Sequence, residues 1–318
     1  MEKILFLINP LAGRRAGTTL KGRIRSELNA GVDLSRYEIQ FTESDALPQV
    51  RGALCGYDTV VVAGGDGTIS QAVREIVGCT PRPKIGIIPV GTGNDLAGSL
   101  GLVNIYRSCG LRALLDIILR GKTTPLDIVV MNDGLCFTNY FGIGADAKIS
   151  NDFNRLRTQT GFQRICSSRL GKALYGLLGL KNARYRIPAA IELDYLDTHT
   201  IRRTVTLPPG MCGLVVSNAR TYAGGVVLSA RAGMNDGLFE VTVFKNMRQR
   251  IMMLFAMLAR APLSSVCPGI VQFQTGALHL HLHGNTFYQL DGEFFDGRAA
   301  AEKSLQFSIA AAADVIVP

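Results

Sequence analysis

DTVVVAGGDGTISQAV, residues 58–73, decides the fold of the first half of the chain. An apolar run typical of a buried strand enters the turn Gly64-Gly65-Asp66-Gly67-Thr68, and helix-like spacing follows directly. Glycine is costly where order is needed, so three glycines here indicate that another group approaches the backbone closely. Successive N–H groups in such a turn can bind an anion, helped by the dipole of a helix whose predicted N-cap is Thr68. A plain tight turn with Asp66 as its turn residue is the alternative.

Residues 1–130 alternate between strand-like and helix-like runs. The predicted strands are 3–8, 36–42, 58–63, 85–89 and 126–131, and the predicted helices between them are 18–29, 46–55, 69–77 and 110–121. This alternation predicts a three-layer α/β domain with a mostly parallel sheet covered on both faces. Such folds bind ligands at the carboxyl ends of their strands, which is where the Gly64–Thr68 turn lies.

Two further turns lie at the same predicted edge of the sheet. NPLAGR (9–14) follows the first strand, and PVGTGNDLA (89–97) follows the fourth. Their side chains offer cations or hydrogen-bond donors to phosphate oxygens, and these are Arg14, Arg15, Thr92 and Asn94. Asp95 adds a carboxylate near a helix start. Three such turns on one edge predict a site for a nucleotide's phosphates.

Two common nucleotide motifs do not explain these turns. The P-loop string G-x-x-x-x-G-K-[ST] does not occur in the sequence. The dinucleotide fingerprint occurs once, as GIGADA (142–147), but no acidic residue lies about 20 positions further on. Neither motif is therefore favoured.

Residues 131–306 show a different pattern, in which short strands are joined by turns. The predicted strands are 134–141, 187–197, 201–208, 211–218, 238–244, 270–275, 278–283, 286–291 and 304–310, with helices near 165–182 and 247–260. They predict an antiparallel sheet or sandwich. We therefore expect an α/β domain at 1–130 and a β-sandwich domain at 131–306, with a tail at 307–318 that can pack back on either domain.

The composition favours an anionic partner. The formal charge is +9 and the pI is near 9.3, which suits nucleotide phosphates or an anionic membrane, and no nucleic-acid motif accompanies the charge. Seven scattered cysteines without a C-x-x-C pair argue for a reducing compartment and against a disulfide framework or structural zinc. The apolar runs at the N-terminus and at 251–263 are too short for a signal peptide or a membrane span. We expect a cytoplasmic protein, soluble or peripheral at the inner membrane face.

The segment 151–186 carries eight Lys or Arg residues against one acid, Asp152. Leucines interleave with these charges between Leu170 and Leu180. A basic helix with leucines can lie on an anionic membrane surface. The same pattern fits an ordinary solvated helix equally well.

HLHLH places His279, His281 and His283 on one face of a predicted strand. Three histidines so arranged could bind a metal ion. No carboxylate or cysteine joins them at ligand spacing, so we predict a solvent-facing strand instead.

NPLAGR, GGDGT and PVGTGNDLA, in this order, resemble the bacterial lipid kinases related to soluble diacylglycerol kinase, within the wider diacylglycerol and sphingosine kinase superfamily. The likeness continues through FGIGADA (141–147), NARTYAGG (218–225), MNDGLFEV (234–241) and QLDGEFF (289–295), so it spans nearly the whole chain. NAD kinases and phosphofructokinases share turns like GGDGT, whereas GTGND and DGE point to the lipid branch. The resemblance implies an NAD kinase-like nucleotide domain, with ATP in the cleft between it and the β-sandwich.

The resemblance also implies roles for individual residues. The residues implied to hold ATP are Asn9, Thr42, Gly64, Gly65, Asp66, Gly67, Thr68 and Thr92, with Asn94 in the same turn as Thr92. In GMNDGL the family binds magnesium, here through the carboxylate of Asp236 and the carbonyls of Gly233 and Leu238. Without the family, N-D-G would be read as a plain hairpin turn.

LDGE (290–293) matches the family's catalytic turn. Glu293 would be the general base that takes the proton from the lipid hydroxyl. The acidic positions that the family groups around magnesium and the phosphates are Asp66, Asp95, Asp127 and Asp291. Read alone, DGE is more often a hairpin turn.

The implied activity is an ATP- and Mg²⁺-dependent transfer of phosphate to a membrane lipid, diacylglycerol first. Phosphatidylglycerol, a sphingoid lipid and soluble NAD are alternative acceptors. A non-catalytic nucleotide- or lipid-binding protein is the alternative class, against which Asp66, Asp95 and Glu293 argue. A missing third glycine after Tyr222 and the absence of a proline before the N-D-G turn leave the lipid's identity open. A homodimer is compatible with this function.

Overall fold

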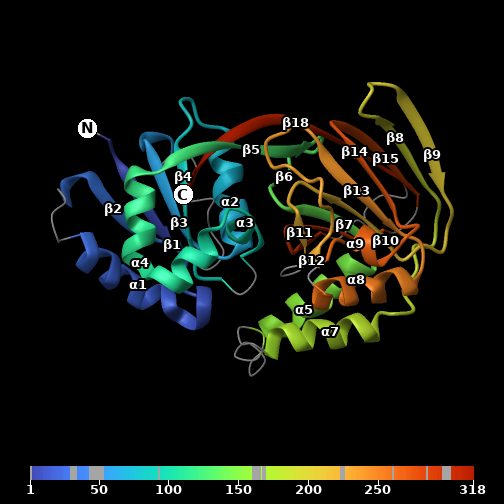
Figure 1. The fold of residues 1–318 in the computed structure, drawn as a ribbon, viewed down its shortest axis with the longest axis horizontal. Coiled ribbons are helices and arrows are strands. Elements are labelled where there is room, and N and C mark those ends of the chain that lie inside the picture. Colours follow the sequence, from blue (N-terminus) through green and yellow to red (C-terminus); the bar gives the residue numbers. More distant parts are fainter. Residues whose placement is uncertain are drawn as a thin grey trace. The chain divides into compact units, whose positions relative to one another are not determined.

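The structure is a computed structural model, and it describes residues 2–28, 34–42, 54–91, 94–159, 166, 170–222, 226–259, 261–283, 286–295 and 302–318. The chain divides into two compact units, Met1–Leu126 with Ala312–Pro318, and Asp127–Ala311. Two long strands, β5 (Lys122–Met131) and β18 (Glu302–Val317), run from one unit into the other (Figure 1). Within the described ranges, no helix has the length and apolar content needed to cross a bilayer.

The first unit contains a parallel sheet, as the sequence predicts. Its strands are β1 (Ile4–Ile8), β2 (Tyr37–Phe41), β3 (Thr59–Gly64) and β4 (Lys84–Pro89), in the order β2-β1-β3-β4. Every neighbouring pair among them is parallel. β1 and β3 are buried along their whole length, as expected for strands covered on both faces. Next to β4, β18 adds a parallel contact that places Val315 opposite Ile85.

The helices of this unit are α1 (Ala12–Leu28), α2 (Asp66–Val77), α3 (Asp95–Ser99) and α4 (Leu102–Arg120), with 3-10 turns η1 (Leu34–Arg36) and η3 (Leu54–Gly56). α2 begins at Asp66 with Gly65 as its N-cap, so the prediction of Thr68 as N-cap is wrong. The apolar residues with helical spacing begin only at Ile69, so the polar first turn of α2 could not be recognised from the sequence. α4 begins at Leu102, before its predicted start, and Gly110, with φ of 82°, kinks it in the middle. The predicted helix 46–55 lies mostly outside the described residues.

Cys55 and Cys79 form a disulfide that ties η3 to the residue after the C-cap of α2. The cysteine pattern argued against a disulfide framework, and it gave no sign of this one disulfide. The two residues become neighbours only after the chain has passed through β3 and α2, so their spacing carries no signal. The remaining described cysteines are free thiols.

The second unit contains two antiparallel layers. One sheet has the order β14-β13-β10-β7-β16-β17, and the other follows β18-β15-β8-β9 within this unit, with β5 paired to β6. Their bounds are β6 (Cys136–Phe137), β7 (Tyr140–Gly144), β8 (Ile191–Leu196), β9 (Arg202–Leu207), β10 (Gly213–Ser217), β13 (Phe239–Phe244), β14 (Val271–Thr275), β15 (Ala277–His283), β16 (Tyr288–Leu290) and β17 (Glu293–Phe295). Phe141 and Phe239 of the first layer share one core with Leu280 and Leu305 of the second. The predicted mostly antiparallel second domain is therefore confirmed.

Helices lie outside these sheets (Figure 1). They are α5 (Ala145–Thr158), α7 (Leu170–Lys181), α8 (Met247–Ala259) and α9 (Leu263–Val266), and a small hairpin pairs β11 (Thr221–Tyr222) with β12 (Val226–Val227). The sequence predicted a basic helical segment at 151–186 but not the start of α5 at Ala145, because the residues of α5 are mostly polar and show no clear helical period. The predicted strand 134–141 is broken into β6 and the start of β7.

Candidate active site

The carboxyl ends of β1 to β4 meet at one edge of the parallel sheet. Asn9 follows β1, Thr42 follows β2, and the Gly64–Thr68 turn follows β3. In this strand order, β1 and β3 are neighbours whose connections leave in opposite directions, the position at which doubly wound sheets bind ligands. Asn9 Nδ2 donates to Thr68 Oγ1 at 2.9 Å, so the two loops are linked at that position.

The two glycine-rich turns contact each other. A Cβ atom on Gly91 would lie 2.3 Å from the Cα atom of Gly65, and one on Gly64 would lie 2.6 Å from the Cβ atom of Thr68. Gly91 N also donates to Gly64 O at 3.1 Å. The glycines predicted that another group comes close to the backbone of the turn. Part of this prediction is explained by the contact between the two turns themselves.

Asp66 and Asn94 hold these turns in place. Asp66 Oδ1 accepts a hydrogen bond from Leu96 N at 3.2 Å, which joins the start of α2 to the start of α3. Asn94 has φ of 58°, accepts from Gly91 N at 3.0 Å and donates to Gly91 O at 2.8 Å. Its amide thus bonds within the turn, and its predicted role as a donor to phosphate stays a prediction. Asp95 is buried beside it.

Some predicted phosphate contacts fall on parts of the chain that the structure does not describe. Thr92 lies outside the described residues, as do the side chains of Arg14 and Arg15. For them the predictions stand unchanged.

In the second unit, LDGE forms the two-residue hairpin between β16 and β17. Asp291 and Gly292 have φ of 48° and 88°, the left-handed pair that tight hairpins use. The buried carboxylate of Asp291 accepts backbone N–H groups from Thr138 at 3.0 Å, Asn139 at 2.9 Å and Tyr140 at 2.8 Å. Both of its oxygens are thus bonded inside the protein, which makes Asp291 an anchor of the turn.

The next residue, Gly292, is fixed as firmly. Its N–H donates to Gln289 Oε1 at 2.7 Å. Its carbonyl accepts from Ser150 Oγ at 2.7 Å and from Asn154 Nδ2 at 3.1 Å, both on α5. The backbone that presents Glu293 is therefore held from two sides, while the Glu293 side chain lies outside the described atoms.

The loop 233–238 gathers acidic groups. Asp127 Oδ2 accepts from Gly237 N at 2.8 Å, and Asp127 N donates to Met234 O at 2.7 Å. A Cβ atom on Gly233 would lie 2.5 Å from Asp236 Oδ2, so this carboxylate is folded against the Gly233 backbone. Burial, and after it the charge of Asp236, raise the pKa of Asp127 against the hydrogen bond from Gly237.

Glu240 adds a third carboxyl group near this loop, on β13. It is 2% exposed, and burial raises its pKa to about 8, with the charge of Asp236 contributing in the same direction. Its Oε1 accepts from Gln274 Nε2 at 2.9 Å, whereas its Oε2 has no partner among the described atoms. Burial is thus the main reason why the pKa values of Asp127 and Glu240 are raised, and the charge of Asp236 acts in the same direction on both.

Two family models match the chain along most of its length. The diacylglycerol kinase catalytic domain matches residues 3–131, and the diacylglycerol kinase accessory domain matches residues 136–294. The chain belongs to the diacylglycerol kinase family. The predicted family is therefore confirmed, over both halves of the chain.

Comparisons of this diacylglycerol kinase family member with individual relatives support the same family. It is 30% identical over 261 residues to the diacylglycerol kinase of Mycobacterium tuberculosis H37Rv, covering 80% of this chain and 77% of that one. It is 28% identical over 292 residues to the "Probable lipid kinase YegS-like" of Enterobacter sp. strain 638, covering 90% and 89%. The crystal structure of a diacylglycerol kinase from Bacillus anthracis superposes with a TM-score of 0.67 at 20% identity, covering 100% and 97%, which shows a shared fold.

The FGIGADA motif of this diacylglycerol kinase family member contacts the strand that leads into the LDGE turn. A Cβ atom on Gly142 would lie 2.4 Å from Asp146 Oδ2, which itself accepts from Gln289 Nε2 at 2.7 Å. β7 belongs to an antiparallel sheet, so the dinucleotide fingerprint lacks the parallel βαβ unit it requires. The glycines here make room for a buried polar pair.

Sequence reasoning missed several buried polar side chains around the turn. Asn139 and Asn218 are fully buried, and Asn218 Nδ2 donates to Asp127 O at 2.8 Å. Gln289 and Asp146 form the pair described above. The signal was present for Asn139, Asn218 and Gln289, because each of them interrupts or ends an apolar strand run, where a polar group needs a specific partner.

Proposed function

We propose that this chain is an ATP-dependent kinase that transfers the γ-phosphate of ATP to the free hydroxyl of diacylglycerol, giving phosphatidic acid. The observation that carries the proposal is the fixed LDGE turn in a member of the diacylglycerol kinase family. Relatives from Bacillus subtilis and Mycobacterium tuberculosis bear the name diacylglycerol kinase, which supports this acceptor. Membership of a kinase family implies that ATP is the phosphate donor.

In this proposal residues 1–130 form the ATP-binding domain and residues 131–306 form the lipid-substrate domain. Asn9, Thr42 and the Gly64–Thr68 turn hold ATP. The first N–H groups of α2 have no partner within the helix, so they point a positive field at the phosphates. Thr92 and Asp95 belong to the same nucleotide site and come from the neighbouring turn. Asn94 holds that turn in shape through its hydrogen bond to Gly91 O.

Glu293 acts as the general base. It accepts the proton of the lipid hydroxyl while the hydroxyl oxygen forms a bond to the γ-phosphorus and the bond to ADP breaks. Asp291 is a positioning residue, because its carboxylate is already bonded to three backbone N–H groups. Rigid presentation of the base matters because small misplacements of reacting groups cost large factors in rate.

The residues of the loop 233–238 fit Mg²⁺. Asp236 would supply a carboxylate and Gly233 and Leu238 would supply carbonyl oxygens, and the carboxyl group of Asp127 contacts the same loop through its hydrogen bond from Gly237. These are the hard oxygen ligands that Mg²⁺ prefers. When bound, the ion neutralises acidic groups that otherwise repel each other.

Mg²⁺ should therefore stabilise the folded protein. At Mg²⁺ concentrations about 100-fold above its Kd we expect about 2.7 kcal/mol of added stability, because ligand bound only to the folded state shifts the equilibrium. Asp236→Asn should remove most of this gain, and Asp133→Asn, which changes an exposed acid of the same unit, should keep it. Urea unfolding with and without Mg²⁺ measures the effect. An Asp236→Asn protein that gains as much stability as wild type contradicts this site.

The acceptor is tested by ATP turnover with each lipid in turn. We expect turnover to depend on micelles that contain diacylglycerol, and to be low with phosphatidylglycerol, with a sphingoid lipid or with soluble NAD. A soluble acceptor would need no detergent or lipid interface. Turnover with NAD in the absence of micelles contradicts the proposal, and nucleotide binding by calorimetry without any transfer points to a non-catalytic binding protein.

We further propose that α7 contacts an anionic membrane at the cytoplasmic face. Leu170, Leu177 and Leu180 are 64%, 62% and 65% exposed, at spacings that place them on one side of the helix. The segment 151–186 also carries exposed basic residues, namely Arg155, Lys181, Arg184 and Arg186. An apolar stripe flanked by cations suits the interface of a bilayer with acidic head groups.

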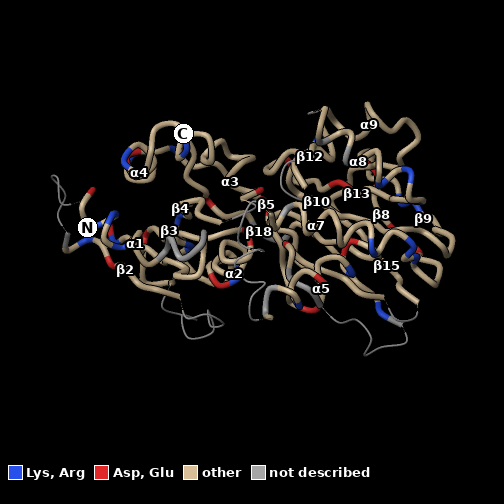
Figure 2. Tube along the Cα trace, turned by 90° about the horizontal axis from the view of Figure 1, so that it is seen from below, with Lys and Arg blue, Asp and Glu red and all other residues tan. Residues whose placement is uncertain are grey.

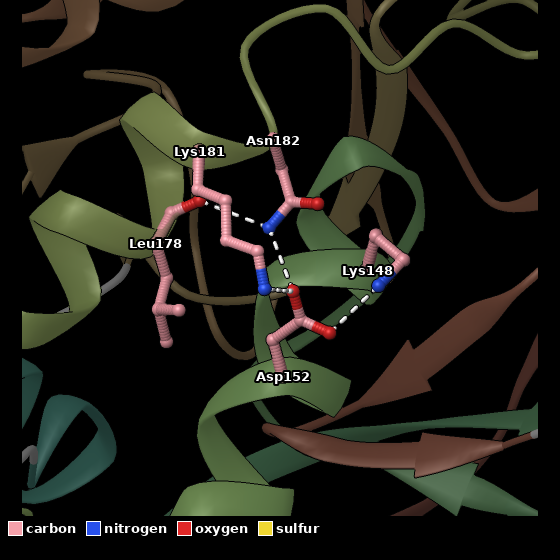
Figure 3. A network of polar contacts seen from close by, with 5 residues as sticks. All are labelled: Lys148, Asp152, Leu178, Lys181 and Asn182. Carbon is pink, nitrogen blue, oxygen red and sulfur yellow. Dashed lines mark hydrogen bonds and ion pairs between the residues drawn. The ribbon is translucent and has the colours of Figure 1, made fainter.

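The one acid of this basic segment is neutralised inside the protein (Figure 3). Asp152 accepts from Lys148 Nζ at 2.6 Å and from Asn182 Nδ2 at 3.0 Å, and Lys181 Nζ lies 3.5 Å away. Burial opposes ionisation, but the hydrogen bonds from Lys148 and Asn182 outweigh it and lower the pKa of Asp152. The network joins α5 to the end of α7, and it pairs the negative charge of Asp152 with Lys148 and Lys181.

Removing the leucine stripe should weaken membrane binding. The double variant Leu177→Asn/Leu180→Asn should bind vesicles of phosphatidylglycerol and phosphatidylcholine at least about tenfold more weakly, since each buried leucine contributes about 1.5–3 kcal/mol. Leu196→Asn, an exposed leucine on β8, is the matched control. Vesicle sedimentation measures binding, and gel filtration measures size. Unchanged sedimentation, or a lost dimer with sedimentation unchanged, contradicts membrane docking and assigns the stripe to another role.

A further inference from the structure

The HLHLH segment forms the solvent side of β15. Leu278, Leu280 and Leu282 are buried in the core between the two sheets, so the alternating histidines face outward. The neighbouring strand β8 supplies acidic partners in register, with Asp194 opposite His279 and Glu192 opposite His281. The carboxylate that sequence spacing did not reveal therefore comes from another strand.

Three of these side chains converge. Asp194, His279 and His281 each offer a ligand atom, and these atoms all lie within 4.8 Å of one another. The imidazole centroids are 4.0 Å apart, and His281 Nε2 lies 3.8 Å from Asp194 Oδ2. All three residues are half-buried, so the backbone of a packed sheet sets their spacing while water can complete a coordination shell.

Neighbouring side chains orient the ligands. Thr204 Oγ1, on β9, donates to Asp194 Oδ1 at 2.6 Å, which leaves Asp194 Oδ2 facing His281. Ser304 on β18 is hydrogen-bonded to His279 Nε2.

One cation competes for the carboxylate. Arg202 Nη2 lies 3.5 Å from Asp194 Oδ2, on the basic strand β9 (Figure 2). Its side chain is 72% exposed, so it can turn into solvent at little cost when another cation takes its place.

We propose that Asp194, His279 and His281 bind a divalent transition-metal ion, for which Zn²⁺ is the best match. Two imidazoles and one carboxylate form a set that Zn²⁺ accepts with water as the fourth ligand. The same set is poor for Mg²⁺, which prefers oxygen ligands. The site is separate from the acidic loop 233–238, and it joins β8 to β15.

The test uses the full chain with Cys109→Ser as background, because Cys109 is an exposed free thiol. Zn²⁺ is titrated in excess Mg²⁺, which occupies the oxygen-ligand sites, and the readouts are binding stoichiometry and thermal unfolding. Co²⁺ replaces Zn²⁺ to report tetrahedral coordination by its visible absorption. The variants are His281→Asn and Asp194→Asn, and His283→Asn, on the same face of the same strand, is the matched control.

We expect one Zn²⁺ per chain, a raised unfolding temperature and tetrahedral Co²⁺ bands in the background protein and in His283→Asn. His281→Asn and Asp194→Asn should lower the affinity at least about tenfold and lose the thermal shift, by analogy with the 10–100-fold losses seen when metal-site partners are removed. The proposal is overturned if the background protein binds no Zn²⁺, if either variant binds as tightly as the background, or if His283→Asn loses as much affinity as they do. Circular dichroism of the zinc-free proteins checks that all variants are folded.

Discussion

Glu293→Gln should lower kcat for phosphorylation of diacylglycerol by about 10²–10⁴-fold, the range that a positioned general base contributes. Gln has the shape of Glu but cannot accept the hydroxyl proton. The turn that carries it is held by hydrogen bonds of Asp291 to Asn139 and of Gly292 to Ser150. ATP affinity and the free energy of unfolding should therefore stay near wild type.

The matched control for this change is Glu192→Gln, which alters an exposed carboxylate of the same unit. Steady-state kinetics on mixed micelles, together with urea unfolding, measure both proteins. A Glu293→Gln enzyme that keeps kcat within a few-fold of wild type would falsify the role of Glu293 as the base. Loss of activity accompanied by equal loss of stability would instead mean that Glu293 holds the turn together.

Asp291→Ala should destabilise the protein by about 3 kcal/mol or more and remove nearly all activity. The variant leaves the N–H groups of Thr138, Asn139 and Tyr140 without their acceptor, in a site where Asp291 is 5% exposed. Each unsatisfied buried group costs about 1–3 kcal/mol. Activity falls because the turn that presents Glu293 loses its anchor.

Asp291→Asn distinguishes an anchor from a metal ligand. The amide keeps one oxygen for the N–H groups of Asn139 and Tyr140, so we expect about half the loss of stability and a partial loss of kcat. Urea unfolding in the presence of a metal chelator makes the measurement independent of Mg²⁺. If Asp291→Ala is as stable as wild type in chelator and loses only its response to Mg²⁺, Asp291 is a metal ligand and the anchoring account is wrong.

The strand–turn–helix unit around Gly64–Thr68 could be predicted from sequence because it is local. The apolar run fixed β3, the glycines fixed the turn, and the period after it fixed α2. The error at Thr68 arose because the first turn of α2 is polar and Gly65 caps it. The contact between Gly65 and Gly91 could not be predicted, since it depends on β3 and β4 lying side by side.

The parts of the site that depend on contacts between distant strands could not be predicted from the sequence. DGE was readable both as a hairpin and as a catalytic turn, and the structure has the hairpin. What spacing could not show is that the Asp291 carboxylate meets residues 138–140. In the same way, Asp194 reaches His279 only through the pairing of β8 with β15. The disulfide between Cys55 and Cys79 belongs to the same class of non-local contacts.

The central claim is that the γ-phosphate of ATP moves to the hydroxyl of diacylglycerol. The most direct measurement incubates the purified protein with Mg²⁺, ATP labelled at the γ-phosphate, and mixed micelles containing diacylglycerol, and then separates and weighs the labelled product. The account predicts label in a lipid phosphomonoester with the mass of phosphatidic acid, formed in equal amount with ADP and lost in Glu293→Gln. Label found only in inorganic phosphate, or no labelled lipid while ADP accumulates, would contradict it.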